Sequence, residues 1–200
     1  IIDATHEADI AAWAGVGFSV GREPRSPLEP HAGDVYYFNR TGELMEASTG
    51  RQDAAVVSYG LRLTVKQYPE GAGTTHLLKT PPPGYYRNKY VHSTDACSIT
   101  MPGNKGEVNK NPIGNELQEI NWSWPEASRP ERLRLYQEFK NHALGYLYYL
   151  QHERGMKNLG LPDDEFLDNG NVPYRVFVRE ARRIHGELTM TEADINPFIT

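Results

Sequence analysis

The feature that most constrains the fold is a long amphipathic helix predicted to begin at Ser128. Residues 128–131, Ser-Arg-Pro-Glu, have the pattern of a capping box with proline near the first helical position. Apolar side chains then recur every three or four residues and share one face: Leu133, Tyr136, Phe139, Ala143, Leu147 and Leu150. Gly155 ends the helix, which should be about 35 Å long at 1.5 Å per residue. Such an apolar face packs against a second layer.

The clearest strand covers residues 57–65. Its apolar side chains alternate with small or polar ones, and the apolar set is Val57, Tyr59, Leu61, Leu63 and Val65. A period of two places one face of a strand in the core and the other in solvent. This alternation is typical of antiparallel sheets.

The first 23 residues predict a strand, a turn and a helix, as in open α/β sheets. Residues 1–4 have the composition of a short buried strand, and residues 6–14 have apolar side chains at helical spacing. Thr5 is expected to cap this helix, with Glu7 and Asp9 in its first turn, where negative charge suits the helix dipole. Residues 18–23 are expected to form a further short strand.

The remaining segments carry weaker signals. Residues 35–38 and 43–47 suggest a hairpin, while prolines and glycines make residues 69–88 and 101–115 irregular. Residues 173–187 suit either a strand or a helix, and Thr191 begins a capping box that starts a last helix. The predicted fold class is α+β. An edge of an α/β domain precedes a domain with an antiparallel sheet and a long helix, with a boundary near Glu23.

Composition excludes several classes of protein. The formal net charge of −5 argues against nucleic-acid binding, which needs a broad basic surface. Cys97 is the single cysteine, so a disulfide framework within the chain is excluded. The sequence has no run of 18 apolar residues that would predict a membrane span, and no signal-peptide pattern. These features favour a cytoplasmic location, with a periplasmic or secreted one left open.

Motifs for metal, acyl-transfer or phosphate chemistry are missing from the sequence. His142 and His152 lie ten residues apart on the predicted long helix, about 15 Å apart along its axis, so they do not make a metal site. The chain contains no Gly-x-Ser-x-Gly elbow, no Gly-x-Gly-x-x-Gly segment and no P-loop. No metal is expected.

A charge cluster at residues 179–183, Arg-Glu-Ala-Arg-Arg, is the strongest candidate for anion binding. Arginine forks bind carboxylates and phosphates through paired hydrogen bonds. On a strand, Arg179 and Arg183 would share one face and Arg182 the other. From the residues alone, a solvated charged strand with internal ion pairs is the favoured interpretation, and anion binding is the alternative.

A family resemblance extends over nearly the whole chain. Residues 178–191 (Val-Arg-Glu-Ala-Arg-Arg-Ile-His-Gly-Glu-Leu-Thr-Met-Thr) closely resemble the most specific segment of the FAD-dependent oxidoreductases, whose members are often labelled xanthan-lyase-like. The opening Asp-Ala-Thr-His-Glu-Ala-Asp at residues 3–9 resembles the family's Asp-Ala-Thr-x-Glu-Gly-Asp stretch, with Ala8 in the place of its glycine. Further collinear resemblances are found at residues 20–23, 101–105, 144–151 and 159–170.

The resemblance implies FAD as cofactor and assigns parts to the chain. Residues 1–23 would belong to the FAD-binding domain, residues 24–178 would form the substrate domain, and residues 179–200 would return toward the cofactor. It also implies that the chain is an internal piece of a longer enzyme, with FAD-contacting segments on both sides. The expected cofactor-binding residues are Thr5, Glu7, Asp9, Arg179, Arg182 and Arg183, and the expected substrate-binding residues are Asn104, Asn109 and His142.

Three functional hypotheses follow. In the first, FAD takes a hydride from a small organic substrate, for which a carbohydrate is one candidate, and the sequence assigns no catalytic base. In the second, the chain is a carbohydrate- or ligand-binding module whose aromatic side chains stack on sugars: Tyr36, Tyr37, Tyr85, Tyr86, Tyr90, Trp122 and Trp124. In the third, it is an inactive structural fragment. The sequence leaves the oligomeric state open.

Overall fold

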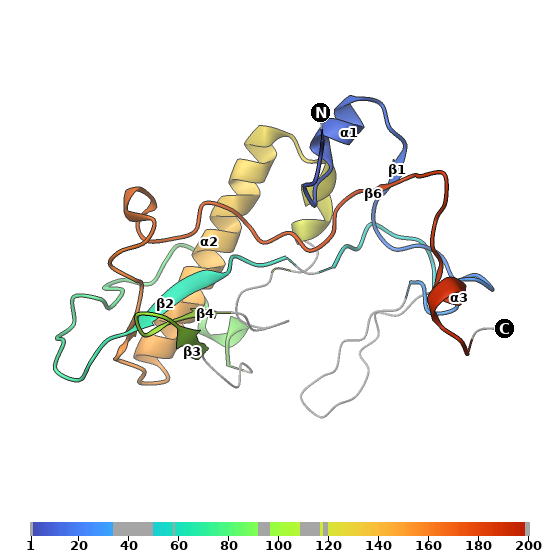
Figure 1. The fold of residues 1–200 in the computed structure, drawn as a ribbon. Helices are drawn as coiled ribbons and strands as arrows, with labels where there is room; N and C mark the ends of the chain where they lie inside the picture. The colour runs from blue at the N-terminus through green and yellow to red at the C-terminus, as the bar shows by residue number, and fades with distance from the viewer. Residues whose placement is uncertain are drawn as a thin grey trace. The chain divides into compact units, whose positions relative to one another are not determined.

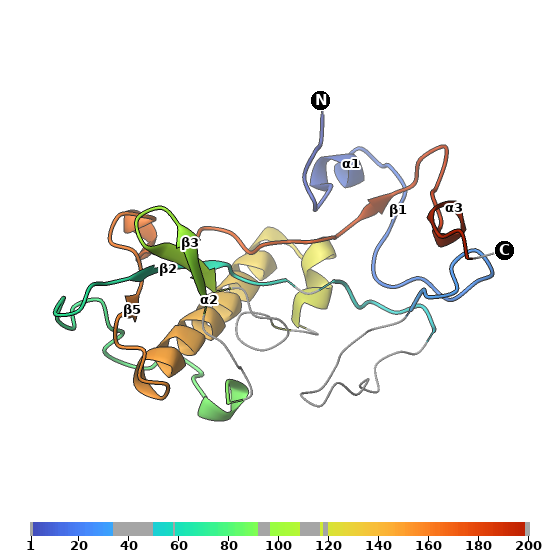
Figure 2. The same ribbon diagram turned by 60° about the horizontal axis from the view of Figure 1, so that its bottom comes forward.

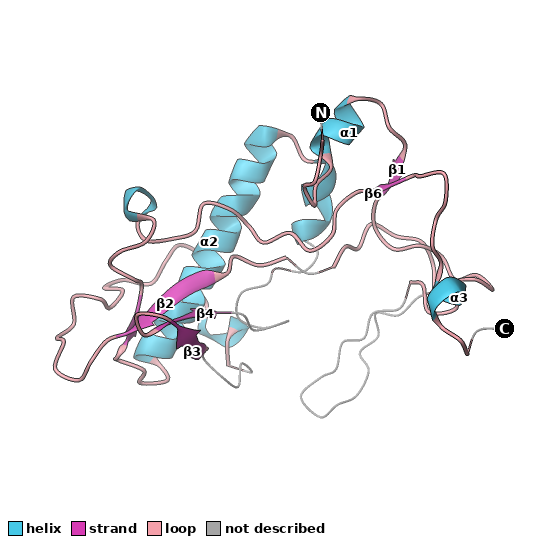
Figure 3. Ribbon diagram, viewed as in Figure 1, coloured by secondary structure: helices cyan, strands magenta, loops and turns pink. Residues whose placement is uncertain are grey.

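The computed structural model describes residues 2–33, 50–57, 59–91, 97–108, 117 and 120–198. The chain divides into two compact units. Unit 1 comprises Ile1–Val57, Trp122–Glu126 and Arg179–Thr200, and unit 2 comprises Ser58–Asn121 and Ala127–Val178. Both contain helices and antiparallel strands joined by long loops (Figure 3), so the predicted α+β class is confirmed. The expected hairpin at residues 35–47 lies outside the described residues.

Unit 2 is built on a four-stranded antiparallel sheet in the order β3-β4-β2-β5. The strands are β2 (Leu63–Gln67), β3 (Ser98–Met101), β4 (Lys105–Val108) and β5 (Leu159–Gly160). The central strand β2 pairs with β4 through Leu63↔Val108 and with β5 through Gln67↔Leu159. The long helix α2 (Arg129–His152) lies along this sheet in both views (Figures 1 and 2).

The predicted alternation around β2 is confirmed in its burial pattern. Tyr59, Leu61, Leu63 and Val65 are fully buried, whereas Val57 is exposed. The hydrogen-bonded strand starts later than predicted, at Leu63, and continues to Gln67. Ahead of it, residue 60 is held by an isolated bridge to Phe177 instead of a continuous ladder.

Helix α2 begins where the sequence predicts it, although its buried face is rotated. Ser128 accepts a hydrogen bond from the backbone N–H of Glu131 at 3.4 Å. Leu133 is exposed, and Leu135 takes its place in the core, so the predicted face was wrong in its first turn. The remaining buried apolar and aromatic side chains of α2 are Phe139, Ala143, Tyr146, Leu147, Tyr149 and Leu150.

The region predicted to be irregular contains a hairpin. Strands β3 and β4 flank a turn at residues 102–104, so the turn signal was right and the strands on either side of it were missed. Two 3-10 helices also lie wholly in unit 2: η1 (Arg87–Lys89) and η3 (Leu167–Asn169). A third, η2 (Ile120–Glu126), covers the residues where the chain passes from unit 2 to unit 1.

Unit 1 contains α1 (Asp9–Trp13), a two-stranded antiparallel sheet of β1 (Phe18–Ser19) and β6 (Arg183–Ile184), and α3 (Glu192–Ile195). The described residues 2–4 form no strand, so that prediction was wrong. Of residues 173–187, only β6 is a strand, and it pairs as Phe18↔Ile184 and Ser19↔Arg183. The Thr191 capping box at α3 is confirmed.

An aromatic cluster fills the space beside α2. Tyr90 is 1% exposed, and its ring lies 5.9 Å from the rings of Tyr146 and Tyr149. Gly145, inside α2, faces this ring. A Cβ atom at Gly145 would overlap the Tyr90 hydroxyl oxygen and lie 3.1 Å from Cζ. Glycine is therefore required by close packing, despite a cost of about 1 kcal/mol relative to alanine in a helix.

We predict that Gly145→Ala lowers the free energy of unfolding by about 1–3 kcal/mol, because overpacking outweighs the better helix propensity of alanine. Urea denaturation followed by circular dichroism measures the change. In a Tyr90→Phe background, which removes the hydroxyl, the same substitution should cost less, and a double-mutant cycle gives the coupling. A Gly145→Ala variant more stable than the parent would contradict this packing argument.

Candidate functional site

The turn that precedes α1 is organised by the carboxylate of Asp3. Its Oδ1 accepts hydrogen bonds from the Thr5 hydroxyl at 2.8 Å and the Thr5 N–H at 3.1 Å. Its Oδ2 accepts from the N–H groups of Ala11 at 3.2 Å and Ile10 at 3.0 Å. These bonds, those from Thr5 foremost, lower the pKa of Asp3. Asp3 therefore caps α1, and the expectation that Thr5 would do so was wrong.

Ala8 holds the backbone of this turn in a left-handed conformation. Its φ is 51° and its ψ is 40°, and the residue is buried. The Ala8 N–H donates to the Thr5 hydroxyl oxygen at 3.1 Å. Non-glycine residues seldom adopt this region. The conformation explains why glycine suits this position in the resembling segment.

Arg182 joins the return segment to this turn. Its Nη1 donates to the Glu7 carbonyl at 2.7 Å and to Asp9 Oδ1 at 2.6 Å. Its side chain is 9% exposed, and the guanidinium lies 5.1 Å from the centroid of the Phe18 ring. Nearby, His6 Nδ1 lies 3.0 Å from the Arg179 carbonyl oxygen. Unit 1 thus brings together predicted cofactor-binding residues that lie more than 170 positions apart.

Arg183 has different partners. Its Nη2 donates to the Gly21 carbonyl at 2.7 Å and to Glu23 Oε1 at 3.2 Å, and its Nη1 bonds to Glu180. These bonds fix the start of β6 beside the segment that follows β1. Arg182 and Arg183 are therefore separated into two sets of contacts, as expected for neighbours in an extended chain.

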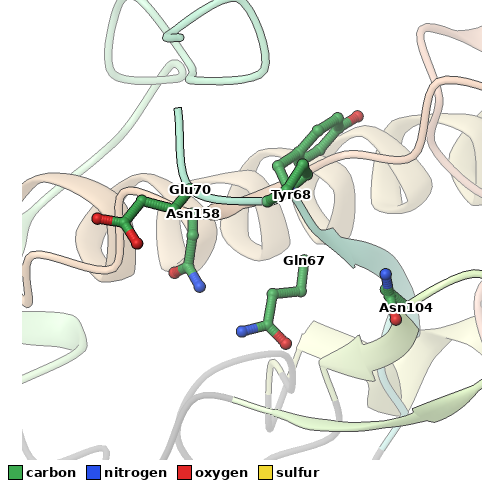
Figure 4. A pocket seen from close by; sticks show the side chains of 6 residues that line it. Gln67, Tyr68, Glu70, Asn104 and Asn158 are labelled. Carbon is green, nitrogen blue, oxygen red and sulfur yellow. The ribbon is translucent and has the colours of Figure 1, made fainter. Parts of the chain in front are cut away.

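The predicted substrate-binding residues do not meet in one cavity. Asn104 lies in the β3–β4 turn and lines a cavity of about 340 Å³ near the end of β2 (Figure 4). His142 lies on α2 and is not among the residues that line this cavity. Asn109 lies outside the described residues.

The His142 ring packs against Tyr90, with ring centroids 5.2 Å apart. Tyr90 donates its hydroxyl hydrogen bond to the His142 carbonyl at 3.1 Å, and the same oxygen lies 3.3 Å from His142 Nδ1. His142 Nε2 is buried and has no partner among the described residues. Burial, with a smaller contribution from Lys89, lowers the pKa of His142 to about 4. The imidazole is therefore neutral near pH 7.

The aromatic side chains considered for a sugar-stacking face differ in how deeply they are buried. Tyr90 and Trp124 are buried, and Tyr85 packs on Tyr90 with ring centroids 5.8 Å apart. Tyr86 and Trp122 are exposed. Tyr36 and Tyr37 lie outside the described residues.

A model of the family described as FAD dependent oxidoreductase matches residues 1–198. The chain belongs to the FAD dependent oxidoreductase family. Searches of curated proteins and of solved structures found no match. The family supports a flavin oxidoreductase type of function with FAD as the cofactor.

The geometry around Arg182 fits one contact with such a cofactor. Arg182 Nε is buried without a hydrogen-bond partner among the described residues, while Nη1 is fixed by Glu7 and Asp9. A nearly buried guanidinium with a free donor suits a phosphate or another anionic oxygen. The N–H groups at the start of α1 are a poorer fit, because Asp3 already occupies them.

Three further findings concern metal sites, membrane spans and the single cysteine. Among the described residues, no group of three histidine, cysteine, aspartate or glutamate side chains is placed to hold a metal ion. No helix in the described ranges is long and apolar enough to cross a membrane. Cys97 is unpaired with another cysteine, and burial raises its pKa, which disfavours the thiolate.

Sequence reasoning missed Asp3, the residue on which this turn depends. An aspartate two positions before a threonine is a signal for an Asx turn, in which the carboxylate bonds to backbone N–H groups. The pattern Asp3-Ala4-Thr5 carries that signal. What it does not reveal is the reach of the same carboxylate to Ile10 and Ala11, because that contact depends on how the turn closes.

We predict that Asp3→Asn exposes the start of α1. An amide offers one acceptor oxygen where the carboxylate offers two, so the Ile10 and Ala11 N–H groups should exchange with solvent faster, as NMR hydrogen exchange would record. Because the folded-state pKa of Asp3 is lowered from 3.8, its stabilisation is present above that value and is lost as the pH falls through the lowered pKa. Asp163→Asn is the matched control in unit 2, and unchanged exchange in the Asp3 variant would refute the cap.

We predict that His142 makes stability pH-dependent. Its folded pKa of about 4 lies below the ordinary 6.5, so the unfolded chain binds the proton more readily. Stability should therefore fall as the pH drops from 6.5 to 4, by up to about 3 kcal/mol. Urea denaturation across this range measures the slope, which His142→Asn should flatten.

The control is His152→Asn, which replaces an exposed histidine on the same helix. The slope should persist in that variant. If His142→Asn and the parent lost stability equally over the range, burial of His142 would not be the cause.

Proposed function

We propose that the protein is an FAD-dependent oxidoreductase in which a hydride passes from an organic substrate to the flavin. The supporting observation is that Arg182 binds the Glu7–Asp9 turn in a chain whose family model matches residues 1–198. We further propose that unit 1 supplies cofactor contacts. Residues 24–178 would supply the substrate side.

In this proposal FAD, when bound, accepts two electrons and a proton from a substrate C–H bond as a hydride. Arg182 contributes a positive charge in a setting with little water, where charge–charge interactions are stronger than in solvent. Asp9 and the Glu7 carbonyl fix the plane of the guanidinium through Nη1. That restraint orients Nε, the atom proposed to donate to an anionic oxygen of the cofactor.

The predicted substrate-binding residues are not equally suited to this role. His142 is neutral near pH 7 and its ring packs against the buried Tyr90, so it favours a structural role over substrate contact. Asn104 presents an exposed amide to a cavity and remains the stronger proposal for substrate contact. Asn109 keeps its proposed role on the family resemblance alone.

The test uses the full-length protein reconstituted with FAD. We expect a flavin absorbance band near roughly 450 nm, as for any oxidised flavin. Arg182→Gln should weaken FAD binding at least tenfold, about 1.4 kcal/mol. Arg182→Lys, which keeps the charge and loses the fork, should retain part of the affinity.

Arg134→Gln is the matched control, because Arg134 forms an exposed ion pair with Glu131 on α2. It should bind FAD as the parent does. Circular dichroism of each variant checks that the fold is kept. Absence of bound flavin in the reconstituted parent would overturn the proposed function, and parental affinity in Arg182→Gln would overturn the role of Arg182.

A further inference from the structure

Three segments of unit 2 converge at the end of strand β2. The Gln67 N–H donates to the Asn104 carbonyl at 2.7 Å, and the Tyr68 N–H donates to the Asn158 carbonyl at 2.7 Å. The β3–β4 turn and the residue before β5 are thereby fixed on either side of the strand end. Together with Pro69 and Glu70, these residues line the cavity of about 340 Å³ (Figure 4).

Three of the six residues that line this cavity have primary amide side chains. Gln67, Asn104 and Asn158 are exposed, and within the described part of the chain their amide groups have no hydrogen-bond partner. Each amide offers two N–H donors and a carbonyl acceptor. In Figure 4, Gln67 lies between Asn104 on one side and Asn158 and Glu70 on the other. The backbone groups of these three residues form the hydrogen bonds that hold the loops together. Their side-chain amides therefore remain available to a ligand.

The surroundings of the cavity are held by specific contacts. The Tyr68 hydroxyl donates to the Leu161 carbonyl at 2.7 Å, and its ring stacks on His76 at 4.2 Å. Lys105, next to Asn104, bonds to Asp164 at 2.8 Å and to Glu165 at 2.7 Å. Asn104 itself adopts a left-handed φ of 57°. Such restraint of the surrounding backbone lowers the entropy that the loops around the cavity would lose on ligand binding.

The charge of the cavity restricts the class of ligand. Glu70 is the one charged side chain among the described lining residues. The neighbouring cations Lys66 and Lys105 are neutralised by ion pairs, Lys66 with Asp163 at 2.6 Å. An anionic ligand would meet the Glu70 carboxylate without a free cation to offset it. A neutral ligand with many hydroxyl groups would match amide donors and acceptors and a carboxylate acceptor.

We propose that this cavity binds a neutral saccharide, with Gln67, Asn104 and Asn158 as the residues that recognise its hydroxyl groups. The volume lies at the lower end of the range of roughly 300–1,000 Å³ typical of small-ligand sites, which suits one or two sugar rings. The proposal concerns unit 2 alone and stands whether or not FAD binds. No aromatic stacking is required, because the Tyr68 ring is already packed on His76.

The experiment titrates the full-length protein, without added FAD, with cellobiose, maltose, mannobiose and xylobiose. Saturation-transfer NMR detects binding, and the side-chain amide signals of Gln67, Asn104 and Asn158 report its location. We expect at least one disaccharide to bind with a millimolar or lower dissociation constant and to shift these signals. Asn158→Ala and Asn104→Gly should each weaken binding at least fivefold, and glycine preserves the positive φ at residue 104.

Asn88→Ala is the matched control, because Asn88 is an exposed asparagine of unit 2 outside the cavity lining. It should bind as the parent does. Digalacturonate, an anionic probe of similar size, should bind more weakly than the best neutral disaccharide. Glu70→Gln removes the carboxylate charge and should narrow the difference between the two dissociation constants.

Several outcomes would overturn the proposal. One is binding of no disaccharide at about 20 mM, well above the expected millimolar range of dissociation constants. Preference for digalacturonate would contradict the assigned ligand class. Shifts of the three amide signals caused by calcium chloride but by no sugar would mean that the oxygen atoms form a cation site instead. None of these readouts depends on FAD. A failure of FAD binding in the same preparation would therefore count against the proposed function and not against the saccharide site.

Discussion

Unit 1 depends on the contact between Arg182 and the Glu7–Asp9 turn. The guanidinium is nearly buried, and burying a charge costs several kcal/mol unless it is paired and hydrogen-bonded. Asp9 supplies the opposite charge, and the Glu7 carbonyl supplies a second acceptor. The β1–β6 pairing alongside adds only two residue pairs. Since a ladder that short is weak by itself, the contacts of Arg182 and Arg183 together make the return of residues 179–185 specific.

The path of residues 179–185 along β1 also explains why the arginines of the charge cluster make separate contacts. In an extended chain, neighbouring side chains point to opposite sides. Arg182 therefore reaches the turn before α1, while Arg183 reaches Gly21 and Glu23. The sequence identifies the cluster, and the resemblance assigns all of it to the cofactor. The pairing of β1 with β6 distinguishes the two roles. Arg182 fits an anionic ligand, and Arg183 stabilises the start of β6.

Local signals predicted much of the fold, and long-range contacts account for what they missed. The cap at Ser128, the capping box at Thr191 and the alternation through Leu61–Val65 depend on residues close in sequence, and all three are present. The rotation that buries Leu135 and exposes Leu133 depends on where α2 meets the sheet, which spacing alone does not determine. The β3–β4 hairpin was missed because proline and glycine in its turn outweighed two short strands.

The candidate cofactor turn shows how local strain and local bonding are balanced. A left-handed alanine costs roughly 1–2 kcal/mol relative to the ordinary helical region. At Ala8 this cost is offset by the hydrogen bond from its N–H to Thr5 and by the Asp3 carboxylate, which accepts two N–H groups of α1. The left-handed residue lets the chain reverse so that the Glu7 carbonyl and the Asp9 carboxylate face the same guanidinium. The strain at Ala8 and the pairing of Arg182 are thus two parts of one arrangement, and a relaxed backbone at residue 8 would separate the two acceptors that hold the arginine.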